Sequence, residues 1–109
     1  MDFVSKKCVP CEGGMPPMPR MEAESNLKEV SGWSLFEDGV LKIKRSFKFK
    51  DFTEALIFVN KVSKIAEEED HHPDISFGWG KAEVTLYTHA VGGLSENDFI
   101  LAAKINQLP

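Results

Sequence analysis

The residues best suited to chemistry gather around one short acidic stretch of this 109-residue chain. Two of its three histidines are adjacent within residues 67–73, and a proline follows them directly. The third lies in a later strand-like segment that folding could bring back to the pair. An imidazole, with an ordinary pKa of about 6.5, gives or takes a proton at neutral pH, and a nearby carboxylate fixes its tautomer. The groups concerned are His71, His72 and His89, with the carboxylates Glu67, Asp70 and Asp98.

Spacing alone leaves three interpretations of these histidines open. They could transfer protons in catalysis, ligate a metal together with a carboxylate, or lie exposed at a helix end and cap carbonyls. Spacing by itself favours the last, because isolated histidine clusters are weak evidence. The metal site ranks lowest, since adjacent histidines in an extended segment point in opposite directions and the usual His-x-His or His-x3-His spacing is absent.

Composition narrows the class of protein. Hydrophobic residues make up 42% and charged residues 28% of the chain, which indicates one ordinary globular domain. The net charge of −4 argues against a nucleic-acid partner. No stretch approaches the roughly 20 apolar residues of a membrane span, so we expect no membrane contact. The N-terminus has no secretory signal pattern, which predicts a cytoplasmic location, or an organelle if the chain is a processed form.

Residues 1–20 form an arm of turn-forming residues, ahead of a domain predicted at residues 21–109. The arm carries Cys8-Val9-Pro10-Cys11, a spacing used by zinc sites and redox pairs. A zinc site would need two more ligands nearby, and no βαβ context supports a redox motif. We therefore expect an ordered or partly ordered arm with two free thiols and no metal.

The remaining chain reads as seven elements in the order α-β-β-α-β-β-α. Asp38-Gly39 is a strong hairpin signal, Asp51 with Glu54 begins the longest helix, and Ser95 with Asp98 caps the last one. The predicted helices cover residues 21–30, 52–66 and 96–108, and the predicted strands cover residues 33–37, 40–50, 75–79 and 81–89. This order predicts an α+β fold, a four-stranded antiparallel sheet with helices packed on one face.

Two strand patterns bear on the site. Alternation over residues 81–89 places His89 at the end of a strand, on the face away from the core. In residues 40–50 the apolar face is interrupted by Arg45, where we expect that strand to leave the core.

A longer motif is more specific than the histidines alone. The run Glu67-x3-His71-His72-Pro73-x5-Trp79-x9-His89-x8-Asp98 resembles the signature of the pterin-4a-carbinolamine dehydratase family, with every position filled. The similarity extends to Gly32-Trp33, to the segment Phe47-Lys-Phe-Lys-Asp-Phe, and to Thr88-His89 with the Gly-Leu-Ser-Glu that follows. It covers about residues 21–108, so the arm lies outside it.

The resemblance implies the same α+β fold, usually associated as a homodimer or homotetramer. The implied reaction is dehydration of 4a-hydroxytetrahydropterin to quinonoid dihydropterin, which recycles the cofactor of aromatic amino-acid hydroxylases without a metal or bound cofactor. By resemblance the three histidines are catalytic, and we expect His72 and His89 to carry most of the acid and base work. The implied substrate-binding residues are Trp33, Glu67, Asp70, Pro73, Thr88 and Asp98.

Some of these residues also have plain structural interpretations. Trp33 opens a strand and fits a core position, Asp98 fits a helix cap, and Trp79 is expected to be structural. The alternative function is a binding role, because members of the family also serve as dimerisation cofactors of transcription factors or as assembly factors. A binding role would not require all three histidines, so their presence favours the enzyme.

Overall fold

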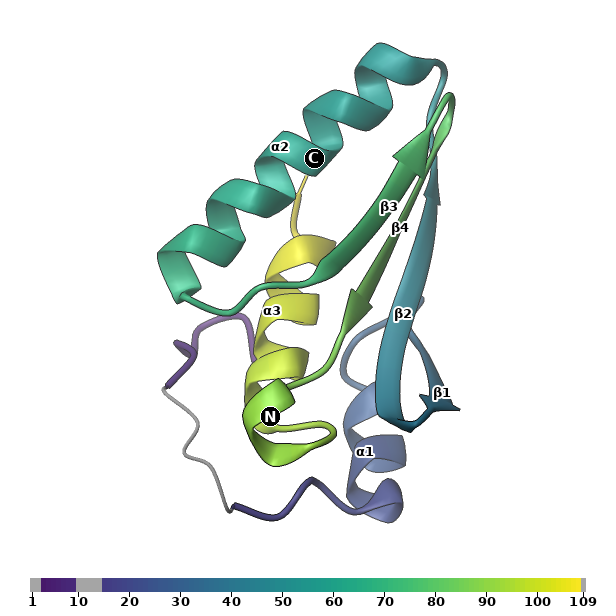
Figure 1. Ribbon diagram of the computed structural model, residues 1–109. Helices are drawn as coiled ribbons and strands as arrows, with labels where there is room; N and C mark the ends of the chain where they lie inside the picture. Colours follow the sequence, from purple (N-terminus) through teal and green to yellow (C-terminus); the bar gives the residue numbers. More distant parts are fainter. Residues whose placement is uncertain (1–2, 10–14, 109) are drawn as a thin grey trace.

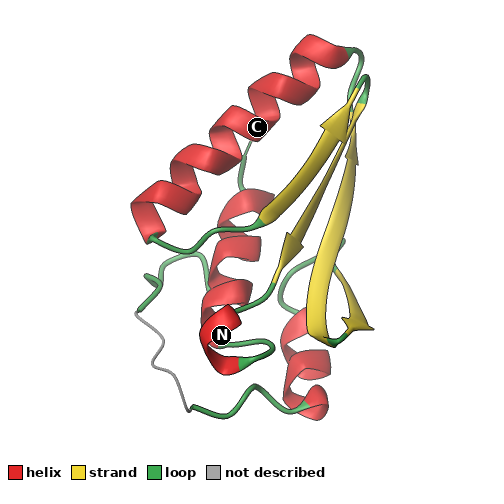
Figure 2. Cartoon of the chain, in the orientation of Figure 1, coloured by secondary structure: helices red, strands yellow, loops and turns green. Residues whose placement is uncertain are grey.

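The computed structural model describes residues 3–9 and 15–108. Figures 1 and 2 show helices on one side of a twisted sheet, in the order predicted from the sequence. The α+β prediction is therefore confirmed. The elements are α1 (Arg20–Leu27), β1 (Ser34–Asp38), β2 (Val40–Lys48), α2 (Phe52–Glu69), β3 (Asp74–Gly78), β4 (Lys81–Leu86), the single 3₁₀ turn η1 (His89–Val91) and α3 (Glu96–Asn106).

The sheet has four antiparallel strands in the order β1-β2-β4-β3. Gly39 turns the first hairpin with a φ of 77°, a left-handed conformation that glycine adopts without strain. The register sets Ile43 opposite Leu35 on one side and Leu86 on the other. The apolar residues of the central strands therefore share the face that meets the helices.

Helices α2 and α3 pack together and cover that face, while α1 lies against β1 (Figure 1). Their common core is buried and consists of aliphatic side chains with the aromatic rings of Phe3, Trp33, Phe58 and Phe99. Its largest fully buried members are Val30, Ile43, Val62, Val84, Leu86, Leu94, Phe99, Ile100, Leu101 and Ile105. No helix within the described residues is long and apolar enough to cross a membrane.

Helix α2 begins with a side-chain cap and ends with a backbone cap. The carboxylate of Asp51 accepts a hydrogen bond from the N–H of Glu54 (2.9 Å), as the sequence predicted. At the other end Asp70 adopts a left-handed conformation (φ 52°, ψ 42°), and the N–H of His71 reaches back to the carbonyl of Ala66 (3.2 Å). This Schellman-type ending satisfies a helix carbonyl and turns the chain sharply toward the site.

The prediction that His89 ends a strand is wrong. Strand β4 stops at Leu86, because Thr88 pairs with Gly93 across a tight loop and its N–H donates to the carbonyl of Gly93 (2.7 Å). His89 instead opens the 3₁₀ turn η1 inside that loop, where it is exposed. Helix α1 and strand β2 are also shorter than predicted, ending at Leu27 and Lys48.

Arg45 interrupts the apolar face of β2 because it anchors the C-terminal end of α3. Its guanidinium donates to the side-chain oxygen of Asn106 (2.6 Å) and to the carbonyl of Ser31 (3.2 Å). The indole N–H of Trp33 donates to the same Asn106 oxygen (2.9 Å), and the Trp33 side chain is buried. Trp33 is therefore part of the core at this end of the helix.

The described parts of the arm contact the core of the domain. Phe3 is 2% exposed and stacks on Phe99, with ring centroids 5.9 Å apart. The N–H of Met18 donates to the carbonyl of Leu94 (2.8 Å). Cys8 is a free thiol, and Cys11 lies outside the described residues. The boundary at residue 20 stays a prediction.

Candidate active site

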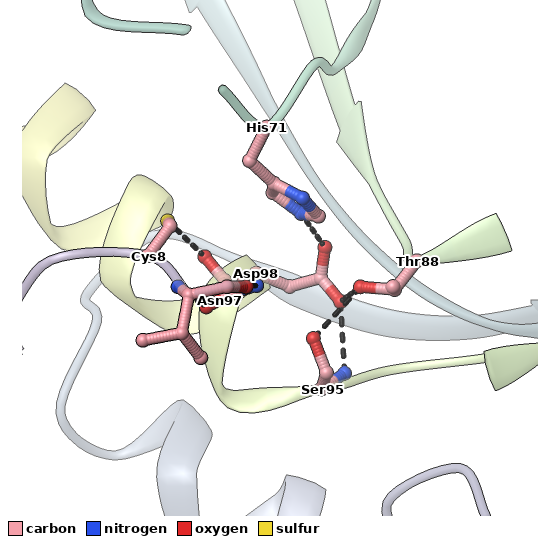
Figure 3. A network of polar contacts seen from close by, with 7 residues as sticks. Cys8, His71, Thr88, Ser95, Asn97 and Asp98 are labelled. Carbon is pink, nitrogen blue, oxygen red and sulfur yellow. Dashed lines mark hydrogen bonds and ion pairs between the residues drawn. The ribbon is translucent and has the colours of Figure 1, made fainter. Parts of the chain in front are cut away.

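A buried imidazole–carboxylate pair lies where the end of α2 meets the start of α3 (Figure 3). Nε2 of His71 is 2.7 Å from Oδ1 of Asp98. The His71 side chain is 11% exposed and the Asp98 side chain is fully buried. Because the carboxylate oxygen accepts, Nε2 carries the shared proton and Nδ1 is the nitrogen left for another partner.

The second oxygen of Asp98 is held by two further donors. Oδ2 accepts from the backbone N–H of Ser95 (2.9 Å) and from the hydroxyl of Thr88 (2.9 Å). Since the Thr88 hydroxyl proton goes to Asp98, the 2.8 Å contact between the hydroxyls of Thr88 and Ser95 requires Ser95 to donate. Asp98 therefore caps α3 and contacts His71 at the same time, so its two interpretations do not compete.

The turn at Asp70 sends the two adjacent histidines in opposite directions. His71 points inward to Asp98, whereas His72 points outward and contacts the carboxylate of Glu67, one turn back on α2. The His72 side chain is 56% exposed, so this second pair is open to solvent. Pro73 then fixes an extended path into β3.

His89 directly follows Thr88, in the loop between β4 and α3, and is exposed. Its Nδ1 is 3.2 Å from the hydroxyl of Tyr87, and the two rings lie 4.3 Å apart by centroid. On the sheet, the ammonium of Lys42 covers the Tyr87 ring at 4.4 Å from its centroid. The backbone at Thr88, whose hydroxyl reaches Asp98, therefore leads directly into His89, while the His89 ring itself lies against Tyr87.

Two residues named from the sequence lie apart from this region. Trp33 contacts Asn106, eight residues along α3 from Asp98, a separation of about 12 Å at 1.5 Å per residue. Trp79, expected to be structural, is 71% exposed in the turn between β3 and β4 and so contributes no core burial. Asp70 contributes its backbone conformation, which sets the direction of the histidines.

The sequence alone did not single out several residues that surround the pair. Ser95 was named as a cap and within the segment shared with the family, Glu69 only as part of the acidic run, and Asn97 not at all. Asn97 precedes Asp98 and is 4% exposed, and Glu69 is 8% exposed. A charged or amide side chain buried to this degree is unusual unless it is paired, but burial cannot be inferred from the acidic run around Glu69.

The electrostatics at the end of α2 are set by Glu69. Burial would raise the pKa of its carboxyl, but hydrogen bonds from Lys104 (2.8 Å) and from the N–H of Cys8 (2.8 Å), with the nearby ammonium charges, hold that pKa below its usual range. Burial, with the charge of Glu69 second, raises the pKa of the Cys8 thiol to about 12. Cys8 is therefore a protonated thiol at neutral pH.

The donor set of the site suits proton transfer. The ring nitrogens left over are Nδ1 of His71, Nδ1 of His72 and Nε2 of His89, and each can give or take a proton. Within residues 3–9 and 15–108, no cluster of three His, Cys, Asp or Glu side chains has the geometry to hold a metal ion.

Comparisons with known proteins agree on one family. The family model for pterin 4 alpha carbinolamine dehydratase matches residues 16–108. A Halorhodospira halophila protein described as a pterin-4-alpha-carbinolamine dehydratase is 55% identical over 108 residues, covering 99% of this chain and 98% of the relative. One from Rubrobacter xylanophilus is 49% identical over 107 residues, 98% of each chain.

Solved structures show the same fold. A Brucella melitensis protein described as a transcriptional coactivator/pterin dehydratase aligns with a TM-score of 0.76 at 38% identity, covering 83% of this chain and 95% of that one. A pterin dehydratase-like RuBisCO assembly factor aligns with a TM-score of 0.58 at 21% identity, over 69% of this chain and 86% of that one, which supports the fold alone. This chain belongs to the pterin-4-alpha-carbinolamine dehydratase family of hydro-lyases.

Proposed function

We propose that this protein dehydrates 4a-hydroxytetrahydropterin to quinonoid dihydropterin and water by general acid–base catalysis from its histidines. The observation that carries the proposal is the buried Asp98, which holds His71 in one tautomer and reaches Thr88, the neighbour of His89. A carboxylate that fixes an imidazole in this way prepares the ring for a defined role in proton transfer.

The reaction requires two proton transfers and no change of oxidation state. The bond from C4a to the hydroxyl breaks as an acid protonates the leaving oxygen, which departs as water. A base removes the proton from N5, and the nitrogen electron pair forms the new double bond to C4a. One proton is given and one is taken, so the enzyme returns to its starting charge without a metal or a bound cofactor.

We assign most of the acid and base work to His72 and His89, while His71 is also catalytic and contacts the substrate. Both side chains are exposed, and each keeps one ring nitrogen beyond its contact with Glu67 or Tyr87. Exposed imidazoles exchange protons rapidly with water, which lets them reset between turnovers. Pro73 and Thr88 are proposed to shape the edges of the pterin site.

The test is a stopped-flow measurement of 4a-hydroxytetrahydropterin decay, with wild type compared with His72→Ala and His89→Ala. We expect acceleration by wild type and a fall of roughly tenfold or more in each variant, equal to about 1.4 kcal/mol of transition-state stabilisation. A folded wild-type protein that gives no acceleration would refute the proposed activity. A wild-type rate retained in both variants would refute the assignment of the histidines.

The proposed cellular role is to recycle the pterin cofactor of aromatic amino-acid hydroxylases in the cytoplasm. Such hydroxylases release the 4a-hydroxy product, so an enzyme that dehydrates it restores the cofactor for reduction. A hydroxylase partner is part of this proposal.

A binding role is the second candidate, favoured by exposed apolar side chains. Phe52, Leu56 and Ile57 of α2 are 46%, 39% and 49% exposed, and Phe77 on the edge strand β3 is 39% exposed. Apolar side chains grouped on a surface often mark an interface. We propose that they serve a homodimer or homotetramer or a protein partner, and light scattering on the purified protein would give the mass of the assembly.

A further inference from the structure

A short part of the arm, residues 6–9, lies against the end of α2 and the first turn of α3, and we call it the strap. Figure 3 shows Cys8 of the strap next to Asn97, the residue before Asp98. The family model begins at residue 16, so the strap lies outside the segment that defines the family. Its contacts go to the end of α2 and to the first turn of α3.

The first anchor of the strap is Glu69, the last residue of α2. One carboxylate oxygen accepts from the backbone N–H of Cys8 (2.8 Å), and the other contacts the ammonium of Lys104 on α3 (2.8 Å). The Glu69 side chain is 5% exposed and that of Lys104 is 19% exposed. A buried carboxylate with two oriented donors has one position, because losing either donor leaves buried charge unsatisfied.

The second anchor is Asn97 in the first turn of α3. Its side-chain oxygen accepts from the N–H of Val9 (3.0 Å), and its amide nitrogen donates to the carbonyl of Val9. The Cys8 sulfur lies 3.6 Å from the backbone carbonyl oxygen of Asn97. Because the pKa of this thiol is about 12, it stays protonated and can donate to that oxygen. The Asn97 side-chain amide therefore makes two hydrogen bonds to the backbone of the strap, one as acceptor and one as donor.

Each anchor lies next to one member of the catalytic pair. Glu69 precedes His71 by two residues, and Asn97 immediately precedes Asp98. We propose that the strap is a positioning element that ties the two halves of the pair together, with Glu69 and Asn97 as its positioning residues. This rests on the proposed dehydratase function, because it assumes that the His71 orientation matters to the reaction.

The position of the strap should influence the distance between His71 and Asp98. His71 and Asp98 lie on different elements, the end of α2 and the start of α3, and their 2.7 Å contact depends on how those ends are placed. The Glu69–Lys104 ion pair and the strap both link these elements close to that contact. Loosening the strap should therefore loosen the pair before it unfolds the domain.

The test compares Asn97→Ala with Asn106→Ala in the full chain. Each change removes from α3 an asparagine whose side chain is hydrogen-bonded to another segment of the chain. Asn106, however, lies at the far end of α3, where it accepts from Arg45 and Trp33. Imidazole ¹⁵N spectra report the His71 tautomer, and stopped-flow kinetics report kcat and KM. We expect Asn97→Ala to mix the Nε2–H and Nδ1–H forms and to lower kcat about fivefold or more, because small misplacements are costly in catalysis.

Asn106→Ala should lower Tm comparably while leaving the His71 spectrum and kcat at wild-type values. Glu69→Gln is a second variant, since it keeps an acceptor for Cys8 but loses the charge, and we expect the same change in the His71 spectrum. Equal Tm loss in both asparagine variants with an unchanged His71 spectrum would overturn the proposal. The spectrum needs no turnover, so an inactive wild type would refute the function and still leave the strap testable.

Discussion

Replacing Asp98 by asparagine should move the ring proton of His71 from Nε2 to Nδ1. The backbone N–H of Ser95 and the hydroxyl of Thr88 both donate to Oδ2, so in Asp98→Asn the amide oxygen must take that place. The amide NH₂ then faces Nε2 of His71 and donates to it. Nε2 must become an acceptor, and the ring proton moves to Nδ1, the nitrogen offered to the substrate.

The magnitude follows from the contacts of Asp98. A hydrogen bond to a charged group is roughly twice as strong as a neutral one, so two retained bonds each lose about 1 kcal/mol. Stability should fall by about 2 kcal/mol, which lowers Tm by roughly 8–16 °C in a domain of this size. The inverted tautomer should lower kcat on the order of 100-fold, about 2.7 kcal/mol, which is within the range of general acid–base contributions.

Three measurements check this, namely thermal unfolding by circular dichroism, stopped-flow kcat, and ¹⁵N shifts of the His71 ring. Glu54→Gln is the matched control, because Glu54 is also an acid in the first turn of a helix, where it accepts from the backbone N–H of Lys50 (2.9 Å), but it is exposed and lies at the opposite end of α2 from His71. The reasoning is refuted if Asp98→Asn keeps the Nε2–H tautomer, or if it keeps kcat within about twofold while the tautomer inverts.

The other predictions concern the two groups with shifted pKa values. The Glu69 pKa lies below the ordinary 4.5, so its stabilisation is present above pH 4.5 and is lost as pH falls through the lower folded value. Urea unfolding should show Glu69→Gln less stable than wild type at pH 7, with the difference in unfolding free energy shrinking below pH 4.5. The exposed neighbour gives the control, Glu68→Gln, which should show no such change, and a difference for Glu69→Gln that stays constant with pH would contradict the prediction. In a Cys11→Ser background, Cys8, with a pKa of about 12 against 9.0, should react with iodoacetamide at pH 8 roughly 1,000-fold more slowly than a free thiol. Alkylation at the free-thiol rate would show that the strap leaves its position.

The fold was largely predictable because its signals are local. The side chain of Asp51 and the backbone N–H of Glu54 lie three residues apart and form their bond within one turn. Asp38-Gly39 likewise sets a hairpin by its own backbone preferences. Strand β4 was overextended because alternation continues through Tyr87, while the pairing of Thr88 with Gly93 that ends the strand depends on loop closure.

The sequence predicted candidate site residues but not how they contact one another. The motif named His71 and Asp98, but their contact joins residues 27 apart in sequence and depends on how α2 meets α3. The same limit hid Glu69 and Asn97, whose partners lie 61 and 88 residues away in the arm. Nothing in the local sequence distinguishes the buried Glu69 from the exposed Glu68 beside it.

Because of the left-handed turn at Asp70, the number of residues between Ala66 and His71 decides which histidine faces Asp98. His71 and His72 point to opposite sides of an extended chain. The hydrogen bond from the N–H of His71 back to the carbonyl of Ala66 fixes the number of residues between the end of the helix and the two histidines. Deleting one residue between Ala66 and His71 would move His72 into the place of His71 beside the buried carboxylate, and inserting one would move His71 into the exposed place of His72. The spacing of the motif should therefore tolerate no insertion or deletion at this point.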